Sequence, residues 1–197
     1  MLNTKINKKG LTALLLFSAV VSILASSLTI SAAGKEKYIS SYMQFARQQQ
    51  KKTKKKLCYA IVNASDGKMP VLLITDSWLK MGGKCTAVAK VYSYSGSKVV
   101  YITKMRSTGS GYPLIKKGKY IISGWHHSSQ RLMVSDAKGY MESVEGFGLE
   151  NGKYYQRTWT VVNGKKRKMA TKKISVKKAS SLDFYSNGNI IRFKKVK

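Results

Sequence analysis

This chain of 197 residues carries 37 lysines and arginines against 8 acidic residues, and its formal net charge at pH 7 is +29. The length suits one domain rather than two and is sufficient for a sizeable hydrophobic core. Lysines are interleaved with tyrosine, isoleucine and valine along the chain, which argues against a disordered polyelectrolyte. The sequence contains no phosphate-binding glycine loop, zinc signature or cofactor fingerprint, so we expect no cofactor.

Residues 1–33 have the three parts of a secretory signal peptide. Three lysines precede an apolar stretch from Leu11 to Ile30, and small residues stand before Gly34. We expect signal peptidase to cut before Gly34, which would leave the mature chain secreted or at the cell surface. The alternative is a retained membrane anchor, because about 20 residues can cross a bilayer. Serines and threonines dilute the apolar stretch, and this favours cleavage.

Residues 34–56 predict an N-terminal helix followed by a basic linker. Tyr38, Tyr42 and Phe45 recur with helical spacing, so they share one side of a helix over residues 35–50. We expect this aromatic side to dock on a sheet. The following Lys-Lys-Thr-Lys-Lys-Lys run is too charged to pack and indicates a solvated linker or helix end.

Residues 57–197 predict a mainly β domain, because short apolar runs alternate there with turn residues. The predicted strands are Leu57–Val62, Val71–Thr75, Lys84–Tyr94, Lys98–Met105, Tyr120–Ser123, Arg131–Ser135, Tyr140–Leu149, Tyr154–Val162 and Ile190–Lys194. Asn-Gly pairs begin at residues 151, 163 and 187, and they supply the positive φ angles of tight hairpins. The fold prediction is therefore an antiparallel meander or propeller-like sheet with one N-terminal helix.

The two cysteines, Cys58 and Cys85, each begin an apolar run. In an exported protein such a pair favours a disulfide, here between neighbouring strands. The alternative is two buried free thiols in a reducing environment. Two cysteines alone do not form a metal site, so we expect no bound metal.

The segment Tyr59–Asp76 reads Tyr-Ala-Ile-Val-Asn-Ala-Ser-Asp-Gly-Lys-Met-Pro-Val-Leu-Leu-Ile-Thr-Asp. It resembles a segment of small secreted proteins of Gram-positive anaerobic bacteria, in which an Asp-x-Asx-x-Asp-Gly-x-Pro-Glu loop joins two apolar strands. That loop is similar to the calcium loops of integrin-type propeller repeats and EF-hands. The likeness extends over Tyr120–Tyr155 and Phe184–Arg192. It implies a fold and a location more than an activity.

The loop departs from the pattern at the positions that would bind calcium. Asn63, Ser65 and Gly67 fall on the three oxygen-bearing positions, and a valine falls on the glutamate. Calcium requires six to eight oxygen ligands, several of them carboxylates. Asp66 is the one carboxylate in the loop and is out of register, with Lys68 beside it. We expect a turn that keeps the shape without the ion.

His126 and His127 are the only histidines and carry the alternative functional hypothesis. With a neighbouring serine and Asp136 they could form a nominal Ser–His–Asp set, as in a small hydrolase. Alternatively, the protein could be a small inhibitor that contacts its target through this loop. A triad is recognised by geometry, however, and the sequence has no strained nucleophile turn. The residues therefore favour a protein that is not an enzyme, with no catalytic residue assigned.

Two dense basic runs predict the functional surface. The candidate polyanion-binding residues are Lys51, Lys52, Lys54, Lys55, Lys56, Lys165, Lys166, Arg167, Lys168, Lys172 and Lys173. Lysine outnumbers arginine, which suits diffuse contact with a polyanion more than bidentate recognition. Nearby aromatic residues could stack on sugars or bases: Tyr154, Tyr155, Trp159, Phe184 and Tyr185.

The prediction is an exported, non-catalytic binding module for an anionic polymer. The polyanions outside a Gram-positive cell are teichoic acids, glycosaminoglycans, DNA and anionic lipid headgroups. We expect a monomer, and no small-molecule substrate is identified. The alternative is that the lysines form a general solubility surface.

Overall fold

The computed structural model describes residues 36–67, 69–79, 85–95, 97–107, 112–125, 128–135, 141–162, 165–182, 185 and 187–197. The chain divides into two compact units, Met1–Lys37 and Tyr38–Lys197, and nearly all described residues belong to the second. The predicted signal peptide lies outside the described residues. Of the helices that are described, none combines the length and hydropathy needed to span a membrane.

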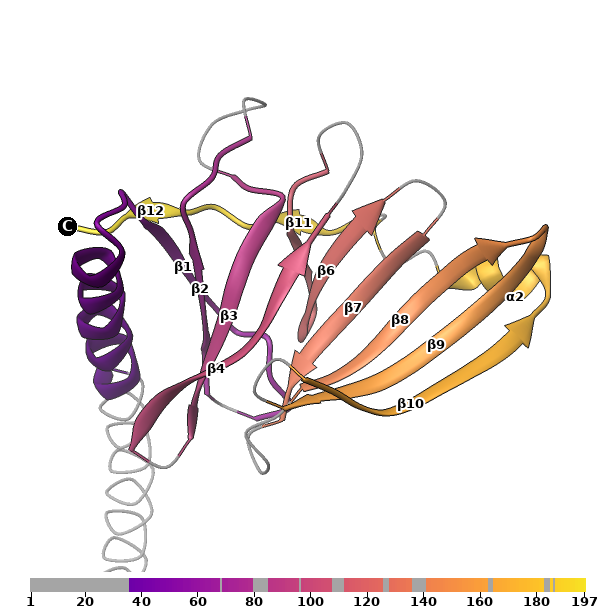
Figure 1. The fold of residues 1–197 in the computed structure, drawn as a ribbon, viewed down its shortest axis with the longest axis horizontal. Helices are drawn as coiled ribbons and strands as arrows, with labels where there is room; N and C mark the ends of the chain where they lie inside the picture. The colour runs from indigo at the N-terminus through magenta and orange to yellow at the C-terminus, as the bar shows by residue number, and fades with distance from the viewer. Residues whose placement is uncertain are drawn as a thin grey trace, which may run out of the picture. The chain divides into compact units, whose positions relative to one another are not determined.

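Two antiparallel sheets form most of the second unit (Figure 1). The first has the order β12-β1-β2-β3-β4, and the second has the order β10-β9-β8-β7-β6-β5-β11. The strands are β1 (Cys58–Val62), β2 (Val71–Thr75), β3 (Val88–Ser95), β4 (Lys98–Arg106), β5 (Ile115–Lys117), β6 (Tyr120–Trp125), β7 (Ser128–Val134), β8 (Met141–Glu150), β9 (Lys153–Val162), β10 (Lys165–Ile174), β11 (Asn189–Ile190) and β12 (Lys194–Lys195). Most neighbours in a sheet are consecutive in the chain, so the predicted mainly β antiparallel meander is confirmed.

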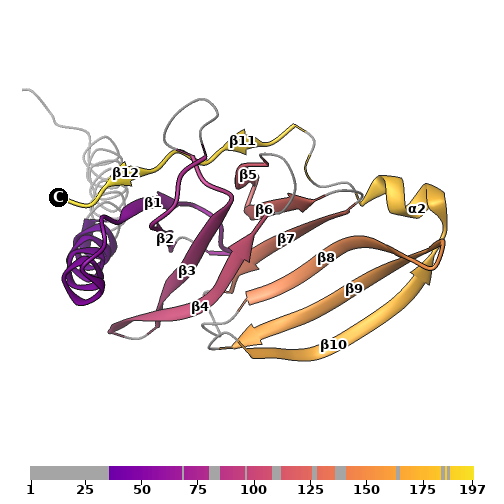
Figure 2. The ribbon, with the colours of Figure 1, turned by 45° about the horizontal axis from the view of Figure 1, so that its top comes forward.

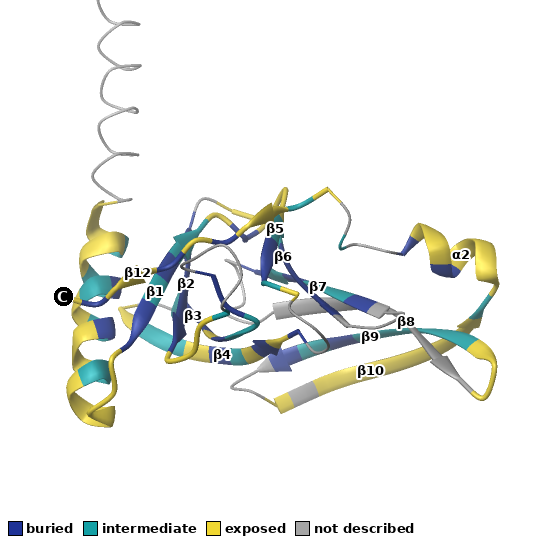
Figure 3. Cartoon of the chain, turned by 90° about the horizontal axis from the view of Figure 1, so that it is seen from above, coloured by how far each residue is buried: buried dark blue, intermediate teal, exposed yellow. Residues whose placement is uncertain are grey.

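The N-terminal helix covers residues 36–53 and docks on the first sheet, as its aromatic spacing predicts. Tyr42 and Ala46 are fully buried and pack in one cluster with Leu72 and Tyr92. The Tyr42 hydroxyl donates to the carbonyl oxygen of Pro70 at 2.7 Å. Figure 3 shows the buried side of this helix facing the strands. The helix continues three residues into the lysine run, so that run is not a linker throughout.

The largest hydrophobic cluster combines residues of both sheets. Leu73 and Ile102 come from the first sheet, and Ile121 and Trp159 come from the second. All five residues of β2 are buried, with Leu73 in this cluster and Leu72 in the cluster beneath the helix. β2 is therefore covered on both faces.

One predicted hairpin turn is confirmed by its backbone angles. Asn151 has φ 49° and Gly152 has φ 71°, which is the type I′ geometry that Asn-Gly favours. The turn joins β8 to β9, and Glu150 pairs with Lys153. Residues 163–164, the second predicted Asn-Gly turn, lie outside the described residues, although Val162 pairs with Lys165 on either side of them.

The C-terminal segment differs from the prediction of one strand at Ile190–Lys194. It forms two short strands in different sheets: β11 pairs with β5, and β12 pairs with β1. Figure 2 shows this segment passing from one sheet to the other. Three further elements were not predicted, namely β5, β10 and the short helix α2 (Val176–Ser181). β10 lacks the apolar alternation that marks a half-buried strand, and β5 and α2 are short.

Candidate functional site

The first predicted basic run lies at the end of the N-terminal helix, and we call it the helix-end cluster (Lys51, Lys52, Lys54, Lys55 and Lys56). All five side chains are exposed. Lys54 follows the last helical residue and has φ 55°. The Nζ atom of Lys55 lies 2.5 Å from Oδ2 of Asp76, and this hydrogen bond holds the pKa of Asp76 below its usual range. One charge of this cluster is therefore already compensated within the protein.

A small cavity of about 270 Å³ adjoins the helix-end cluster. Its walls include Lys55, Lys90 and Lys104, together with Asp76. The cavity is thus basic on balance. The carboxylate of Asp76 competes with any incoming anion, which makes this a weaker anion site than its lysines alone would indicate.

The second predicted basic run forms β10, and we call it the β10 cluster (Lys165, Lys166, Arg167, Lys168, Lys172 and Lys173). Among the described strands β10 pairs with β9 alone, so it is an edge strand of the second sheet. The described side chains from residue 165 to residue 173 are all exposed, including Met169 with 62% of its surface accessible. Successive side chains of a strand point to opposite faces, so both faces of this edge carry positive charge. The two clusters lie in different parts of the fold (Figure 1).

A β-bulge interrupts β10 at Lys168 and Met169. Arg167 pairs with Thr160 and Ala170 pairs with Thr158, so two residues of β10 stand opposite one of β9. Lys168 has φ 48°. Bulges and lysines on an edge strand both hinder pairing with another sheet. The edge is thereby kept available for side-chain contacts rather than for strand addition.

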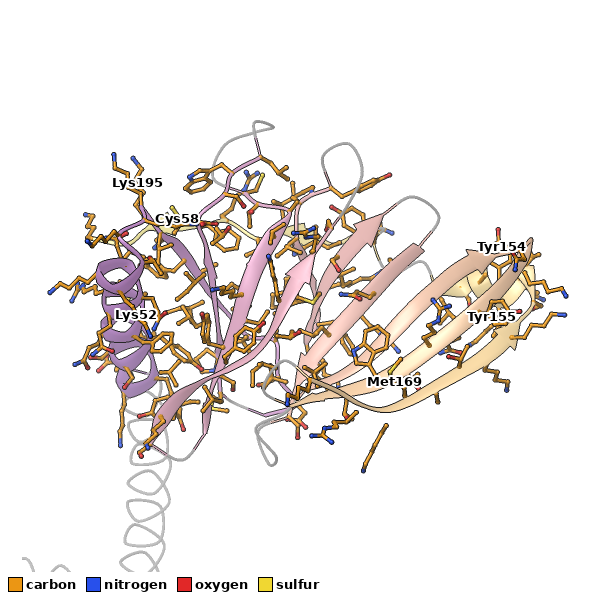
Figure 4. The ribbon with its side chains drawn as sticks, viewed as in Figure 1. Lys52, Cys58, Tyr154, Tyr155, Met169 and Lys195 are labelled. Atoms are coloured by element: carbon orange, nitrogen blue, oxygen red, sulfur yellow. The ribbon has the colours of Figure 1, made fainter. Side chains whose placement is uncertain are left out.

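The aromatic residues near this edge divide into accessible and inaccessible ones. Tyr154 and Tyr155 are half-buried near the start of β9 (Figure 4), and Tyr155 pairs with Lys173 across the strands. Trp159 is 6% exposed and belongs to the main core, so its predicted role in stacking on a ligand is wrong. Residue 184 lies outside the described residues.

Tyr185 makes contacts within the protein through both its hydroxyl and its ring. Its hydroxyl donates to the carbonyl oxygen of Pro113 at 2.5 Å, and its ring makes an edge contact with Tyr112. The pKa of Tyr185 is raised to about 12, mainly by burial and additionally by the nearby Tyr112 and Cys85. These contacts indicate a structural role for Tyr185 rather than the predicted ligand stacking.

The raised pKa of Tyr185 predicts a loss of stability in alkali. The unfolded phenol ionises near pH 10 and the folded one near 12, so the folded state retains the proton longer. Its contribution to the free energy of unfolding is complete below about pH 10 and declines as the pH rises toward 12. Urea unfolding of the native chain and of the Tyr185→Phe variant, repeated at several pH values between about 10 and 12, measures this contribution. The difference between the two curves isolates Tyr185 from the many lysines; a difference that stays constant with pH would contradict the prediction.

Cys58 and Cys85 are both buried and are not joined by a disulfide in the structure, which differs from the predicted bond. Cys58 lies in β1, whereas Cys85 precedes β3, and β2 stands between those two strands. The two cysteines are thus not on neighbouring strands as the sequence suggested. Burial raises the pKa of the Cys58 thiol, and nearby Lys195 partly offsets this.

The calcium-like loop is closed by hydrogen bonds of its own. The Ser65 hydroxyl donates to the carbonyl oxygen of Met69 at 2.7 Å. The backbone N–H of Asp66 donates to the carbonyl oxygen of Val134 at 3.0 Å, which ties the loop to the end of β7. Among the residues that the structure describes, no group of three or more histidine, cysteine or acidic side chains could hold a metal ion. His126 and His127 lie outside the described residues.

A pocket of about 950 Å³ beside β12 is a further basic site, which the sequence analysis did not predict. Its positive side chains include Arg47 from the helix and Lys194 and Lys195 from β12. These residues are about 150 positions apart in the chain. The Phe-Lys-Lys-Val-Lys sequence at residues 193–197 was the available signal, but its partners come from other elements.

Comparison with protein-family models, with curated proteins and with solved structures found no match to this chain.

Proposed function

We propose that the chain is an exported, non-catalytic binding module that associates with an anionic polymer outside the cell, principally through the β10 cluster. The observation that carries this proposal is the long edge strand whose described basic side chains are all exposed. Ten residues of β10 extend over roughly 33 Å, which is enough to follow several charges of a linear polymer.

The sequence around β10 adds further positive charge and contains no acidic residue that would compete with an anionic ligand. The sequence has no acidic residue between Glu150 and Asp183, a region that includes β9, β10 and α2. Lys177 and Lys178 of α2 extend the basic run beyond the end of the strand. An uncompensated positive region of this length attracts a polyanion and releases its counterions on binding.

The residue types favour a polymer with repeated phosphates or carboxylates over a specific base sequence. Lysine is a compact, strongly hydrated point charge and does not impose bidentate geometry. Tyr154 and Tyr155 provide aromatic surface at one end of the strand, on which sugars of a wall polymer such as teichoic acid could lie.

The proposal predicts salt-sensitive retention on purified Gram-positive walls. The logarithm of the binding constant should fall linearly with the logarithm of salt concentration. Changing Lys165, Lys168, Lys172 and Lys173 to glutamine should weaken binding at low salt and reduce the slope by roughly 3, since each lost contact removes about 0.7–0.9. Heparin and DNA measured over the same salt series report how far the preference extends to other polyanions.

A matched variant separates a specific site from general charge. Changing Lys51, Lys52, Lys54 and Lys56 to glutamine removes the same charge from the helix-end cluster, and it should weaken binding less. Equal loss in the two variants would show that net charge alone is responsible. Retention that does not change between low and high salt would contradict polyanion binding altogether.

A further inference from the structure

The pocket beside β12 is built from four separate segments of the chain. Arg47 comes from the N-terminal helix, Tyr59 from β1, Trp78 from the segment after β2, and Phe193 with Lys194 from the C-terminal segment. Its volume of about 950 Å³ lies within the range of small-molecule sites, roughly 300–1,000 Å³. It is distinct from the β10 cluster, which belongs to the other sheet.

The apolar part of the pocket leaves part of a large aromatic side chain accessible to solvent. Trp78 is 42% exposed, although indole is among the largest apolar side chains. Tyr59 is half-buried beside it in the pocket wall, and Phe193 is almost wholly buried. A ligand with an apolar body would remove the exposed part of Trp78 from water.

The polar part of the pocket is positive. Arg47, Lys194, Lys195 and Lys197 line it with exposed side chains, and none of the described residues that line it is acidic. Figure 4 shows Lys195 beside Cys58 at this end of the first sheet. No described lining residue has an acidic side chain, so Lys194, Lys195 and Lys197 attract an anionic group, in contrast to the cavity that contains Asp76.

Hydrogen bonds join the elements that carry these side chains. Arg47 Nε donates to the backbone oxygen of Lys197, the last residue of the sequence, at 3.0 Å, so this guanidinium already has one partner within the protein. The Gln50 side chain bridges two elements: it accepts from the N–H of Leu57 at 2.8 Å and donates to the carbonyl oxygen of Val196 at 3.3 Å. The N–H of Val196 in turn donates to the carbonyl oxygen of Leu57. The helix, β1 and the C-terminal segment are thus fixed to one another around the pocket.

We propose that this pocket binds a small amphipathic anion, with an apolar chain or ring against Trp78 and a carboxylate or phosphate against Lys194, Lys195 and Arg47. A simple inorganic anion would leave the apolar wall exposed, and a neutral apolar molecule would leave the cations without a partner. This inference does not depend on polymer binding by β10.

The test uses dodecanoate below its micelle concentration, with the chain from Gly34 onward, which contains the whole compact unit Tyr38–Lys197. Calorimetry should detect saturable binding of dodecanoate, whereas acetate (head group alone) and dodecyltrimethylammonium (same tail, opposite charge) should bind at least about tenfold more weakly. Binding should also change the tryptophan fluorescence through Trp78. Comparable binding of either control ligand would overturn the proposal.

Variants locate the site. Lys194→Gln combined with Lys195→Gln, and separately Trp78→Ala, should each weaken dodecanoate binding by about tenfold. Lys172→Gln combined with Lys173→Gln, a matched loss of charge on β10, should leave it unchanged. All three changes are at exposed side chains, and Trp78→Phe replaces Trp78→Ala if the latter unfolds. An equal effect of the β10 variant would overturn the proposal.

A further arm separates a dissolved amphiphile from a membrane surface. Phosphatidylglycerol vesicles present a similar head-group charge but keep the acyl chains in the bilayer. The proposal expects the pocket variants to weaken binding of dissolved dodecanoate whatever they do to vesicle binding. Pocket variants that weaken only vesicle binding would overturn it and indicate a membrane-facing surface.

Discussion

Replacing Leu73 by alanine is expected to lower the free energy of unfolding by about 2–5 kcal/mol. Leu73 has no exposed surface and lies in the cluster that joins the two sheets, where it packs with Val91, Ile102 and Phe193. Its truncation removes apolar contacts from both sheets and leaves a cavity that close-packed neighbours fill only in part. Few single changes in this chain should have a larger effect.

Urea unfolding at moderate salt measures this loss, because salt screens the repulsion among the lysines. Leu72→Ala, on the opposite face of β2, should cost a similar amount, since Leu72 is also fully buried. Val176→Ala is the control, because Val176 is 66% exposed and its change should stay within about 0.5 kcal/mol. A small effect at Leu73 with a large one at Val176 would contradict the described core.

Replacing Gly124 by alanine is expected to destabilise the protein by about 1–3 kcal/mol. Gly124 is buried in β6, and an added Cβ would lie 2.7 Å from Cδ2 of Tyr185. The ring cannot move away freely, because the Tyr185 hydroxyl donates a hydrogen bond to the carbonyl oxygen of Pro113 and the ring contacts Tyr112. The N–H of Gly124 also donates to the Ser107 hydroxyl, so the backbone is held as well.

A double-mutant cycle identifies the clash as the cause. Tyr185→Ala removes the obstructing ring, so Gly124→Ala should cost much less in that background than in the native chain. In the single Gly124→Ala variant, displacement of the ring should also bring the pKa of Tyr185 closer to that of an ordinary tyrosine, which phenolate absorbance measures. Additive effects of the two changes would show that the ring and the glycine do not interact.

Several elements could be predicted because the order of apolar and polar residues along the chain indicates which side chains are buried. The bounds of β2 were predicted correctly, since a continuous apolar run stands between Pro70 and Asp76. The helix stripe with Tyr42 was recognised from its spacing, and the turn at Asn151-Gly152 from the need for positive φ. In each case the local residues alone carry the signal.

Other elements depend on partners that the local sequence does not name. β10 forms because its backbone completes the ladder of β9, which requires no apolar side chain, so a lysine-rich run becomes a strand. The position of Trp159 near the basic run predicts an accessible aromatic, but the packing of the two sheets places it in the core. The pairing of β12 with β1 likewise joins segments far apart in the chain.

Composition and periodicity were enough to predict the strong positive charge, the order of most strands and the side of the helix that packs, because both are local properties of the chain. Three features became visible only once the chain was folded: the second basic run is an exposed edge, Cys58 and Cys85 are buried without a disulfide between them, and Arg47 lines a pocket with Lys194 and Lys195. Sheet edges, the separation of two thiols and the lining of a pocket all follow from which segments become neighbours. That choice is made by long-range burial and backbone pairing, whose partners lie far from each residue in the chain.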